Sequence, residues 1–445
     1  MSGKRRIRLV YYGDDFTGST DALDFLCRSG IPAVLFMDPP DDAMLARFPE
    51  IEAFGVAGMT RTMDPSNMRR TLSDAFQDIR QHNPDFVHYK VCSTFDSSPE
   101  VGNIGIAIET GAATFSTSCV PLLVGNPSLG RYGVFGNLFA RMGTGATGRI
   151  YRIDQHPSMS RHPVTPAKDG DLRDHLARQT DKHIALFDIL ELEKPLQQGR
   201  EQLEAILQES PDILLFDILD ENQFQKIGAL MEDLRSPGHP LFTVGSSGIE
   251  AALCAYWKID EESPVPAYRG VISDPGNVLV VSGSCSPVTG KQIVTAQSAG
   301  FHEISLDVGQ LLSRSFSYIE ETGKMAARIL QGGKSVILHP STGPEDSRIV
   351  ATWDTPSSCL GEQIGEIVLQ VLGRQPVSRV CFAGGDTSSH AARKLQIQAV
   401  EMIHPFEPGA PLCKAYSPLS PVDGLQVNFK GGQVGSPDYF LKLRN

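Results

Sequence analysis

Residues 10–26 read VYYGDDFTGSTDALDFL, and this stretch predicts the fold class of the chain. Val10 and Tyr11 are typical of the end of a buried strand, and the apolar residues of 22–26 recur at the spacing of one helix face. We therefore expect Asp14 and Asp15 at the carboxyl end of a first strand, the edge where open α/β sheets bind their ligands. The local pattern supports one alternative equally well, in which one aspartate caps the helix and the other is solvated.

The alternation of short apolar runs with helical patterns continues along the chain and predicts mostly parallel sheets covered on both faces. At 445 residues the chain is too long for one ordinary core. The stretch 258–276 is rich in proline and charge, as a linker would be. We therefore predict two α/β domains, over 1–260 and 277–445, joined by a linker over 261–276, with any active site in the inter-domain cleft.

The composition excludes several classes of protein. Hydrophobic residues make up 41% of the chain and charged residues 21%, which is typical of a folded globular protein and excludes a largely disordered one. The formal net charge of −12 and the isoelectric point near 5.4 argue against a general affinity for nucleic acid or acidic membranes. An anionic small substrate remains compatible, because local basic residues can serve a site within an acidic protein.

The eight cysteines are scattered, and no pair has C-x-x-C spacing, so neither a zinc ribbon nor a thioredoxin-like motif is indicated. Most lie in apolar runs and are typical of buried free thiols in a reducing compartment. The N-terminal stretch MSGKRRIRLVYYGDD lacks the apolar core of a signal peptide, and no apolar run approaches the ~20 residues that span a bilayer. We therefore expect a cytoplasmic protein.

Two Gly/Ser-rich turns in the second half each follow an apolar run and precede a helical pattern. The first, 282–286, contains Ser284 and Ser286, and the second, 384–389, contains Gly384, Gly385, Asp386 and Thr387. Glycines let the backbone approach a ligand, and the free N–H groups of a helix start favour anions. Each turn alone is more simply explained as a tight turn with helix caps. The two together favour a nucleotide site, with Asp386 as a ligand of Mg²⁺.

Two other glycine-rich stretches are less specific. FKGGQVGSPDYF at 429–440 is compatible with a hairpin turn or with a backbone surface that contacts an adenine or a ribose. GTGATG at 143–148 matches G-x-G-x-x-G only formally, because the preceding GNLFARM has a helical pattern and a dinucleotide loop follows a strand. We therefore predict a helix over 136–142 and a plain loop after it.

Polar side chains cluster at the expected strand ends of the first half. They are Arg61, after the apolar run 52–58, and Lys90, Ser93, Thr94, Asp96 and Asn103 within the segment 89–105. Arg61 and Lys90 suit a substrate carboxylate. The hydroxyl and carboxylate side chains suit substrate hydroxyl groups, and the helix that opens at Asn103 suits an anion. The alternative is that Lys90 extends its ammonium to solvent and Arg61 pairs with a neighbouring aspartate.

These segments together resemble the four-carbon acid sugar kinase family, bacterial enzymes that phosphorylate aldonate-type acids with ATP. GDDFTGSTDAL is similar to the opening motif of that family, and SMSRHPVTP, VVSGSCSPVT, GGDTS and KGGQVGSPDYF have family counterparts in the same order. The resemblance covers nearly the whole chain. It implies an N-terminal substrate domain and a C-terminal nucleotide domain, with ATP contacted by Ser284 or Ser286, by 384–387 and by Gly432.

Some segments depart from the 3-oxo-tetronate branch of the family, to which YKVCSTFDSS and GNIG are otherwise similar. The departures are the residues 98–101 before Gly102, Ile106 in place of a proline, and the stretches 126–143 and 430–435. They look more like the branch that acts on 3-oxo-isoapionate, a branched analogue. Asp386 stands where the family usually has glutamate, which keeps a carboxylate one methylene shorter.

We therefore expect an ATP- and Mg²⁺-dependent kinase that phosphorylates the terminal hydroxyl of 3-oxo-tetronate or 3-oxo-isoapionate, with the substrate and nucleotide sites facing the inter-domain cleft. Asp15 is the expected general base in preference to Asp14, and the expected substrate contacts are Thr17, Arg61, Lys90, Ser93, Thr94, Asp96 and Asn103. The alternatives are a D-threonate or D-erythronate kinase, a non-catalytic sugar-acid and nucleotide sensor, and a nucleotide-dependent ligase. We expect no nucleic-acid or membrane partner, and a homodimer is kept as a hypothesis.

Overall fold

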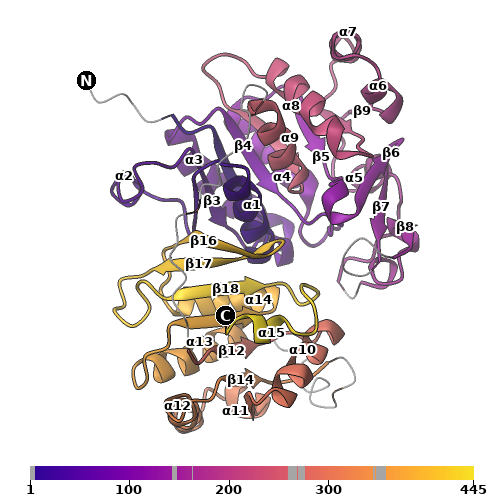
Figure 1. Cartoon of the computed structure of the whole chain (residues 1–445). Helices are drawn as coiled ribbons and strands as arrows, with labels where there is room; N and C mark the ends of the chain where they lie inside the picture. Colours follow the sequence, from indigo (N-terminus) through magenta and orange to yellow (C-terminus); the bar gives the residue numbers. More distant parts are fainter. Residues whose placement is uncertain are drawn as a thin grey trace. The chain divides into compact units, whose positions relative to one another are not determined.

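The computed structural model describes residues 6–142, 148–162, 164–258, 268, 276–343, 346 and 357–444. The chain forms two compact α/β units, each with a mostly parallel sheet and accompanying helices, as the sequence predicts (Figure 1). The first unit comprises Met1–Asp14, Phe25–Ala33 and Asp38–Ala267, and the second comprises Asp15–Asp24, Val34–Met37 and Tyr268–Asn445.

The two units are not the two continuous stretches expected from the sequence. β16 (Ala399–Glu407) pairs antiparallel with β2 (Ala33–Phe36), which places 34–37 in the second unit. The first turns of α1 (Phe16–Arg28) join the same unit, because Thr20 and Asp24 hydrogen-bond to Gly409 at 3.3 Å and 3.2 Å. These contacts join residues that are far apart in the sequence, so no local pattern predicts which unit 15–24 and 34–37 belong to. The predicted linker lies outside the described residues, apart from Tyr268 and Gly276.

The sheet of the first unit is parallel throughout, in the strand order β3-β1-β4-β11-β5-β10-β9. Its strands are β1 (Leu9–Gly13), β3 (Ala53–Ala57), β4 (Phe86–Lys90), β5 (Val120–Leu123), β9 (Ile184–Phe187), β10 (Ile213–Phe216) and β11 (Leu241–Gly245). β1 and β4 are buried along their whole length, as expected of parallel strands covered on both faces. All carboxyl ends therefore lie along one edge, where the polar residues that follow the strands gather.

The helices of the first unit connect these strands. In α3 (Pro65–Gln81), Asp64 caps the N-terminus, proline occupies the first turn, and Met68, Leu72 and Phe76 form one buried face. The other helices are α2 (Asp42–Leu45), α4 (Ile104–Phe115), α5 (Leu172–Leu176), α6 (Ile189–Glu193), α7 (Leu196–Leu207), α8 (Phe224–Asp233) and α9 (Gly248–Trp257). Short 3-10 turns include η1 (Thr60–Thr62) and η2 (Pro127–Leu129).

A small antiparallel sheet within the first unit consists of β6 (Arg131–Val134), β7 (Asn137–Arg141) and β8 (Ile150–Arg152). The predicted helix over 136–142 is therefore wrong. Buried Leu138 and Ala140 alternate with less buried neighbours, which is the period of a strand. Phe135 and Gly136, with φ of 51° and 80°, form the tight turn between β6 and β7. The glycine-rich loop that follows lies, at 143–147, outside the described residues.

The sheet of the second unit is mixed, in the order β13-β14-β12-β15-β18-β17-β16-β2. Pairing is parallel from β13 to β18 and antiparallel from β18 to β2. The strands not yet bounded are β12 (Leu279–Ser282), β13 (His302–Ser305), β14 (Val336–His339), β15 (Arg379–Ala383), β17 (Ala410–Tyr416) and β18 (Gln426–Lys430). The antiparallel part of the sheet has no counterpart among the sequence-based expectations.

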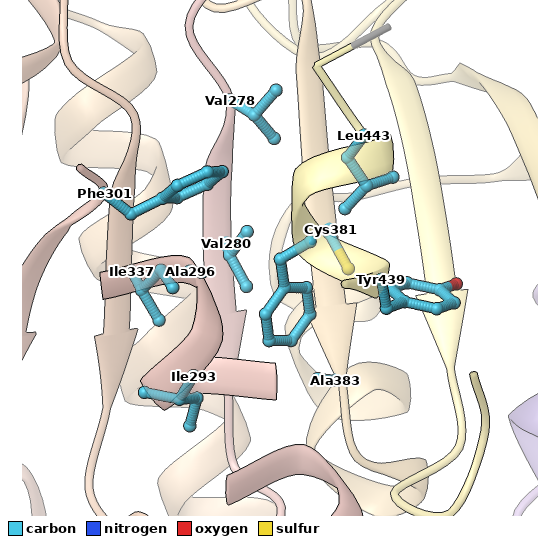
Figure 2. Close-up of a cluster of buried hydrophobic side chains, with 11 residues drawn as sticks. Val278, Val280, Ile293, Ala296, Phe301, Ile337, Cys381, Ala383, Tyr439 and Leu443 are labelled. Atoms are coloured by element: carbon cyan, nitrogen blue, oxygen red, sulfur yellow. The ribbon is translucent and has the colours of Figure 1, made fainter. Parts of the chain in front are cut away.

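A buried apolar cluster holds two helices of the second unit against its sheet. Figure 2 shows Val280 of β12 and Cys381 of β15 packed with Ile293 of α10 and Tyr439 of α15. The helices are α10 (Pro287–Ser298), α11 (Val308–Leu312), α12 (Phe316–Gln331), α13 (Ser357–Leu372), α14 (Gly385–Lys394) and α15 (Tyr439–Lys442). Close packing of this kind fixes the start of α10 relative to the strand ends. Across the described residues of both units, every helix is too short or too polar to cross a bilayer.

Candidate functional site

The carboxyl edge of the first unit's sheet gathers polar side chains. The strand register pairs Gly13 of β1 and Gly245 of β11 with Lys90, the last residue of β4. The N–H of Asp14 donates to the carbonyl of Lys90 at 2.9 Å. Lys90 is 2% exposed, and its Nζ donates to the carbonyl of Val91 at 3.2 Å. Asp14 and Lys90 thus lie at the edge where a parallel sheet binds ligands.

Asp14 holds the guanidinium group of Arg61. Arg61 donates from Nε to Oδ2 at 3.0 Å and from Nη2 to Oδ1 at 2.7 Å, and the aspartate is only 3% exposed. The backbone N–H of Arg61 also donates to the carbonyl of Asp14 at 3.1 Å, because η1 brings Arg61 to this edge. Two parallel charge-assisted hydrogen bonds orient both side chains. The pair corresponds to the alternative stated above, so a substrate carboxylate would meet an arginine that is already engaged.

The segment after β4 carries the predicted hydroxyl contacts. Cys92 Sγ and Thr94 Oγ1 lie 2.9 Å apart, and burial raises the pKa of Cys92 to about 11, so the thiol is neutral near pH 7. Ser93 and Thr94 are half-buried, and Phe95 turns the chain with φ of 58°. Oδ1 of Asp96 is buried and has no hydrogen-bond partner among the described residues. Asp96 is therefore the member of this segment with an open acceptor.

Asn103 caps α4 at the same edge. Its Oδ1 accepts the N–H of Ile106 at 2.8 Å, and its Nδ2 donates to the carbonyl of Pro99 at 3.2 Å. Gln179 accepts the N–H of Ile104 at 2.7 Å. The cap and Gln179 therefore use N–H groups that an anion at this helix start would need.

The structure adds Arg131 to the edge, a residue that the sequence analysis does not select. Arg131 begins β6, and its backbone pairs with that of Asn126, a buried residue just past β5. Nδ2 of Asn126 donates to Oγ of Ser247, just past β11, at 3.1 Å. The only sequence signal is that Arg131 lies in 126–143, a stretch that departs from the 3-oxo-tetronate branch.

Asp15, the residue after Asp14, belongs to the second unit. Its Oδ1 accepts the N–H of Gly18 at 2.6 Å and its Oδ2 accepts the hydroxyl of Thr17 at 3.0 Å, so Asp15 caps the start of α1. In the same unit, a Cβ added to Gly385 would lie 3.7 Å from Oδ2 of Asp15 and 3.7 Å from Oγ1 of Thr17. The carboxylate therefore lies beside the turn that the sequence predicts for the nucleotide.

Three glycine- and serine-rich segments of the second unit meet at the carboxyl ends of β12, β15 and β18. Gly384 has φ of 122°, and a Cβ there would lie 3.2 Å from the backbone N of Ser284. A Cβ on Gly432 would lie 2.6 Å from Oγ of Ser284 and 3.1 Å from Cβ of Ser286. We call this meeting of 284–286, 384–385 and Gly432 the glycine junction. It brings together five of the residues that the sequence predicts as ATP contacts, namely Ser284, Ser286, Gly384, Gly385 and Gly432.

Two helices begin at the glycine junction. Ser286 caps α10 by accepting the N–H of Val288 at 3.1 Å. α14 begins at Gly385, and Thr387 in its first turn packs so closely on Gly283 that a Cβ there would lie 2.1 Å from Oγ1 of Thr387. Both helix starts present the positive end of a helix dipole, which suits a phosphate group, and α14 adds the N–H groups of its first turn.

The predicted metal ligand Asp386 lies in α14, but its side chain falls outside the described residues. Among the side chains that the structure describes, no group of three or more His, Cys, Asp or Glu residues is placed to hold a metal ion. The assignment of Asp386 to Mg²⁺ stays a prediction.

Lys430, the last residue of β18, lies beneath the glycine junction and was not selected from the sequence. It is fully buried, and its Nζ donates to Oγ1 of Thr289 at 3.1 Å. The hydroxyl of Thr289 donates in turn to the carbonyl of Gly432 at 2.8 Å. Nζ also lies 5.5 Å from the ring centroid of Tyr439, one of the residues drawn in Figure 2. Burial lowers the pKa of Lys430 to about 8, so near pH 7 a positive charge supports the Gly432 peptide.

Family models match most of the chain. A model described as a sugar-binding N-terminal domain matches residues 9–253, and a model described as a nucleotide-binding C-terminal domain matches residues 279–440. The segment between the two matches includes the predicted linker.

Curated relatives align over nearly the full length. A protein of Paraburkholderia graminis named 3-oxo-isoapionate kinase is 40% identical, covering 98% of this chain and 94% of the relative. A 3-oxo-tetronate kinase of Pectobacterium atrosepticum is 24% identical, covering 98% and 99%. A 3-oxo-tetronate kinase of Cupriavidus necator is 26% identical, covering 96% and 94%.

Solved structures share the fold. A Salmonella typhimurium protein superposes with a TM-score of 0.79 at 22% identity, covering 98% of both chains. A Haemophilus influenzae protein superposes with a TM-score of 0.72 at 20% identity, covering 97% of this chain and 98% of its own. At these identities the likeness supports the fold alone.

Gly432→Ala should weaken ATP binding at least tenfold, because its Cβ would overlap the hydroxyl of Ser284 and displace the segments of the glycine junction. Titration calorimetry with ATP measures the affinity. Gly332→Ala is the matched control, because its φ is −76° and its Cβ would meet nothing closer than 3.4 Å. Unchanged ATP affinity in Gly432→Ala, or an equal loss in both variants, would contradict the assignment.

Lys430→Met should change how stability depends on pH. Burial lowers the pKa of Lys430 from 10.5 to about 8, so between these values the unfolded chain binds the proton that the folded chain releases. The free energy of unfolding of the wild type, relative to Lys430→Met, should therefore rise with pH above about 8 and level off below it.

Urea unfolding from about pH 7 to about pH 10 measures this difference. Thr289→Val removes the hydroxyl partner but keeps the amine, and it should retain the pH dependence. If the difference in free energy of unfolding between the wild type and Lys430→Met does not change from about pH 7 to about pH 10, the amine of Lys430 is solvated.

Proposed function

The chain belongs to the four-carbon acid sugar kinase family, and on that premise we propose that it transfers the γ-phosphoryl group of ATP to a hydroxyl group of a small 3-oxo sugar acid. 3-Oxo-isoapionate is the first candidate, because the relative named for it is 40% identical over nearly the whole chain. 3-Oxo-tetronate is the second, because the relatives named for it are more distant. The observation that carries the proposal is the glycine junction with the Asp15 carboxylate beside it.

The glycine junction has the features that a polyphosphate needs. Side chains at 384 and 432 would meet Ser284, so the backbone itself forms the surface. The start of α14 supplies N–H groups, and the hydroxyls of Ser284, Ser286 and Thr387 lie around the glycine junction. The buried ammonium group of Lys430 adds positive charge beneath. We assign these groups to the phosphates of ATP, where they act by positioning and by charge stabilisation.

Mg²⁺ is proposed as the ion that accompanies ATP. This ion prefers carboxylate and phosphate oxygens, and it neutralises charge on the transferred phosphoryl group. Asp386, in the first turn of α14, is the proposed ligand, because its carboxylate is an oxygen donor of the kind that a hard divalent cation prefers.

Asp15 is the proposed general base. It would take the proton of the substrate hydroxyl as that oxygen bonds to phosphorus and the bond to the bridging oxygen of ADP breaks. Thr17 and Gly18 hold the carboxylate in one orientation, with Oδ2 beside Gly385. A fixed base suits a reaction that depends mainly on positioning.

The first unit is proposed to bind the sugar acid. Asp14, oriented by Arg61, would accept a hydroxyl group of the substrate, and Lys90 would supply positive charge at the same edge. The open acceptor on Asp96 and the half-buried hydroxyls of Ser93 and Thr94 suit further hydroxyl groups.

A D-threonate or D-erythronate kinase would use the same chemistry on an acid without the 3-oxo group. A non-catalytic sensor would need binding alone. The carboxylate of Asp15 favours catalysis, because it lies beside Gly385 at the proposed phosphate site, where a protein that only binds ATP gains nothing from a negative charge.

ADP release from ATP and Mg²⁺ should be fast with one 3-oxo acid in a panel of 3-oxo-isoapionate, 3-oxo-tetronates, D-threonate and D-erythronate. We expect 3-oxo-isoapionate to be preferred, on the basis of the 40% identical relative. A coupled spectrophotometric assay of kcat/KM for each acid makes the comparison. A flat panel with intact ATP binding would overturn the kinase assignment in favour of the sensor.

Asp15→Asn should lower kcat by roughly 100- to 10,000-fold, the range expected for loss of a general base. Asparagine caps helices about as well as aspartate, so the start of α1 should persist and the melting temperature should stay close to that of the wild type. Steady-state kinetics and calorimetry with ATP should show lost turnover with retained ATP affinity.

Asp188→Asn is the matched control, because Asp188 caps α6 through the N–H groups of Leu190 and Glu191. It should leave kcat unchanged. Retained turnover in Asp15→Asn would remove the base role and leave Asp15 as a helix cap.

A further inference from the structure

Arg131 occupies the carboxyl edge of the first unit's sheet together with the segment 92–96. Its backbone N–H and C=O pair with Asn126 at 3.0 Å and 2.9 Å, and Asn126 is fully buried just past β5. In the strand order β4-β11-β5, the segment 92–96 follows β4 on the same edge. The hairpin of β6 and β7 therefore delivers an arginine to the place where a parallel sheet binds its ligand.

The guanidinium group of Arg131 is anchored through Nη1 but has a second N–H donor for which the described residues offer no acceptor. Nη1 donates to the carbonyls of Leu129 at 3.0 Å, Gly130 at 3.3 Å and Arg141 at 3.4 Å. Nε, in contrast, is buried and has no hydrogen-bond partner among the described residues. The carbonyls of the loop thus fix the orientation of the guanidinium group and leave the Nε–H available to an acceptor from outside the described residues.

Asp96 has an acceptor atom that lacks a donor, just as Arg131 has a donor that lacks an acceptor. Its Oδ1 is buried and, within the part of the chain that the structure describes, also lacks a hydrogen-bond partner. Burial lowers the pKa of Arg131, and the nearby groups Cys92 and Asp96 act in the opposite direction. Asp96 thus lies close enough to affect the pKa of Arg131, although neither unpartnered atom bonds to the other.

Native proteins rarely leave a buried donor or acceptor without a partner, and a bound ligand is one physical explanation of such a gap. A polyhydroxy acid carries both complements on adjacent carbons. Its carboxylate would accept from the Nε–H of Arg131, and its hydroxyl group would donate to Oδ1 of Asp96. A planar guanidinium group suits a carboxylate better than an ammonium group does, because it presents several donors in one plane.

We propose that Arg131 binds the carboxylate of the sugar acid and Asp96 a neighbouring hydroxyl, so that Arg131 selects acids over neutral sugars. The inference rests on the proposed sugar-acid kinase function. It shifts the main carboxylate contact away from Arg61, whose Nε and Nη2 already donate to Asp14.

The test compares the preferred acid with its carboxamide, which is the same size without the charge. Arg131→Gln should raise KM for the acid roughly tenfold to a hundredfold and leave KM for ATP within about twofold of the wild type. The wild-type preference for the acid over the carboxamide should fall by the same factor. Arg131→Lys keeps the charge without the planar donors, so its KM for the acid should lie between those of the wild type and Arg131→Gln.

Arg141→Gln is the matched control, because Arg141 lies in the same hairpin and donates to the carbonyl of Gly148 and the hydroxyl of Tyr132. It should leave the acid-to-carboxamide ratio unchanged. A purely structural role of Arg131 would raise KM for both compounds equally, and an unchanged ratio in Arg131→Gln overturns the proposal.

Calorimetry of the acid without ATP separates this inference from the kinase proposal. If the wild type binds the acid but transfers no phosphoryl group, the kinase proposal is contradicted. The Arg131 proposal is then retained only if Arg131→Gln binds the acid at least tenfold more weakly than the wild type does. A wild type that binds no acid overturns the Arg131 proposal as well.

Asp96→Asn tests the second contact. It should raise KM for the acid about tenfold and have less effect on the analogue that lacks the neighbouring hydroxyl. Asp96 also borders a cavity of about 10 Å³, which can hold one water molecule. If Asp96→Asn leaves KM unchanged, Asp96 serves that cavity and the hydroxyl contact is overturned.

Discussion

The absence of a Cβ at Gly384 and Gly432 is the constraint on which the second unit's site depends. Both backbones approach Ser284 to distances that a side chain would forbid, so the strand ends of β12, β15 and β18 can converge. The starts of α10 and α14 follow from these ends, and Lys430 supports the same peptide from below through Thr289. Backbone donors, helix dipoles and a buried charge thus support the phosphate site that we propose.

Two consecutive aspartates acquire different roles because different partners hold them. Asp14 is fixed by the guanidinium group of Arg61, whereas Asp15 is fixed by the first turn of α1 and lies beside Gly385. The cap and the proposed base role of Asp15 are compatible. A helix cap immobilises a carboxylate while leaving an oxygen lone pair available, which is what a positioned base requires.

The α/β alternation, the strand ends and the two Gly/Ser-rich turns of the second unit could be predicted because each rests on local pattern or backbone chemistry. The short segment 136–142 could not, because a few apolar residues fit one helix face and a strand equally well. That this segment is the strand β7 is important for the proposed site, because β7 pairs with β6 in the hairpin that carries Arg131. The division of the chain between the units was also hidden, because hydrogen bonds of Thr20 and Asp24 to Gly409 have no local signal.

The sequence by itself determined the fold class, the family resemblance and the residue types at each strand end, since these follow from periodicity and from ordered motifs. Only the tertiary structure decided which groups meet. It placed Arg61 on Asp14, the Asp15 carboxylate beside Gly385, and Lys430 beneath Gly432. Such meetings depend on how distant strands align and on which buried polar atoms find partners. Sequence spacing does not encode these properties, because each involves residues far apart along the chain.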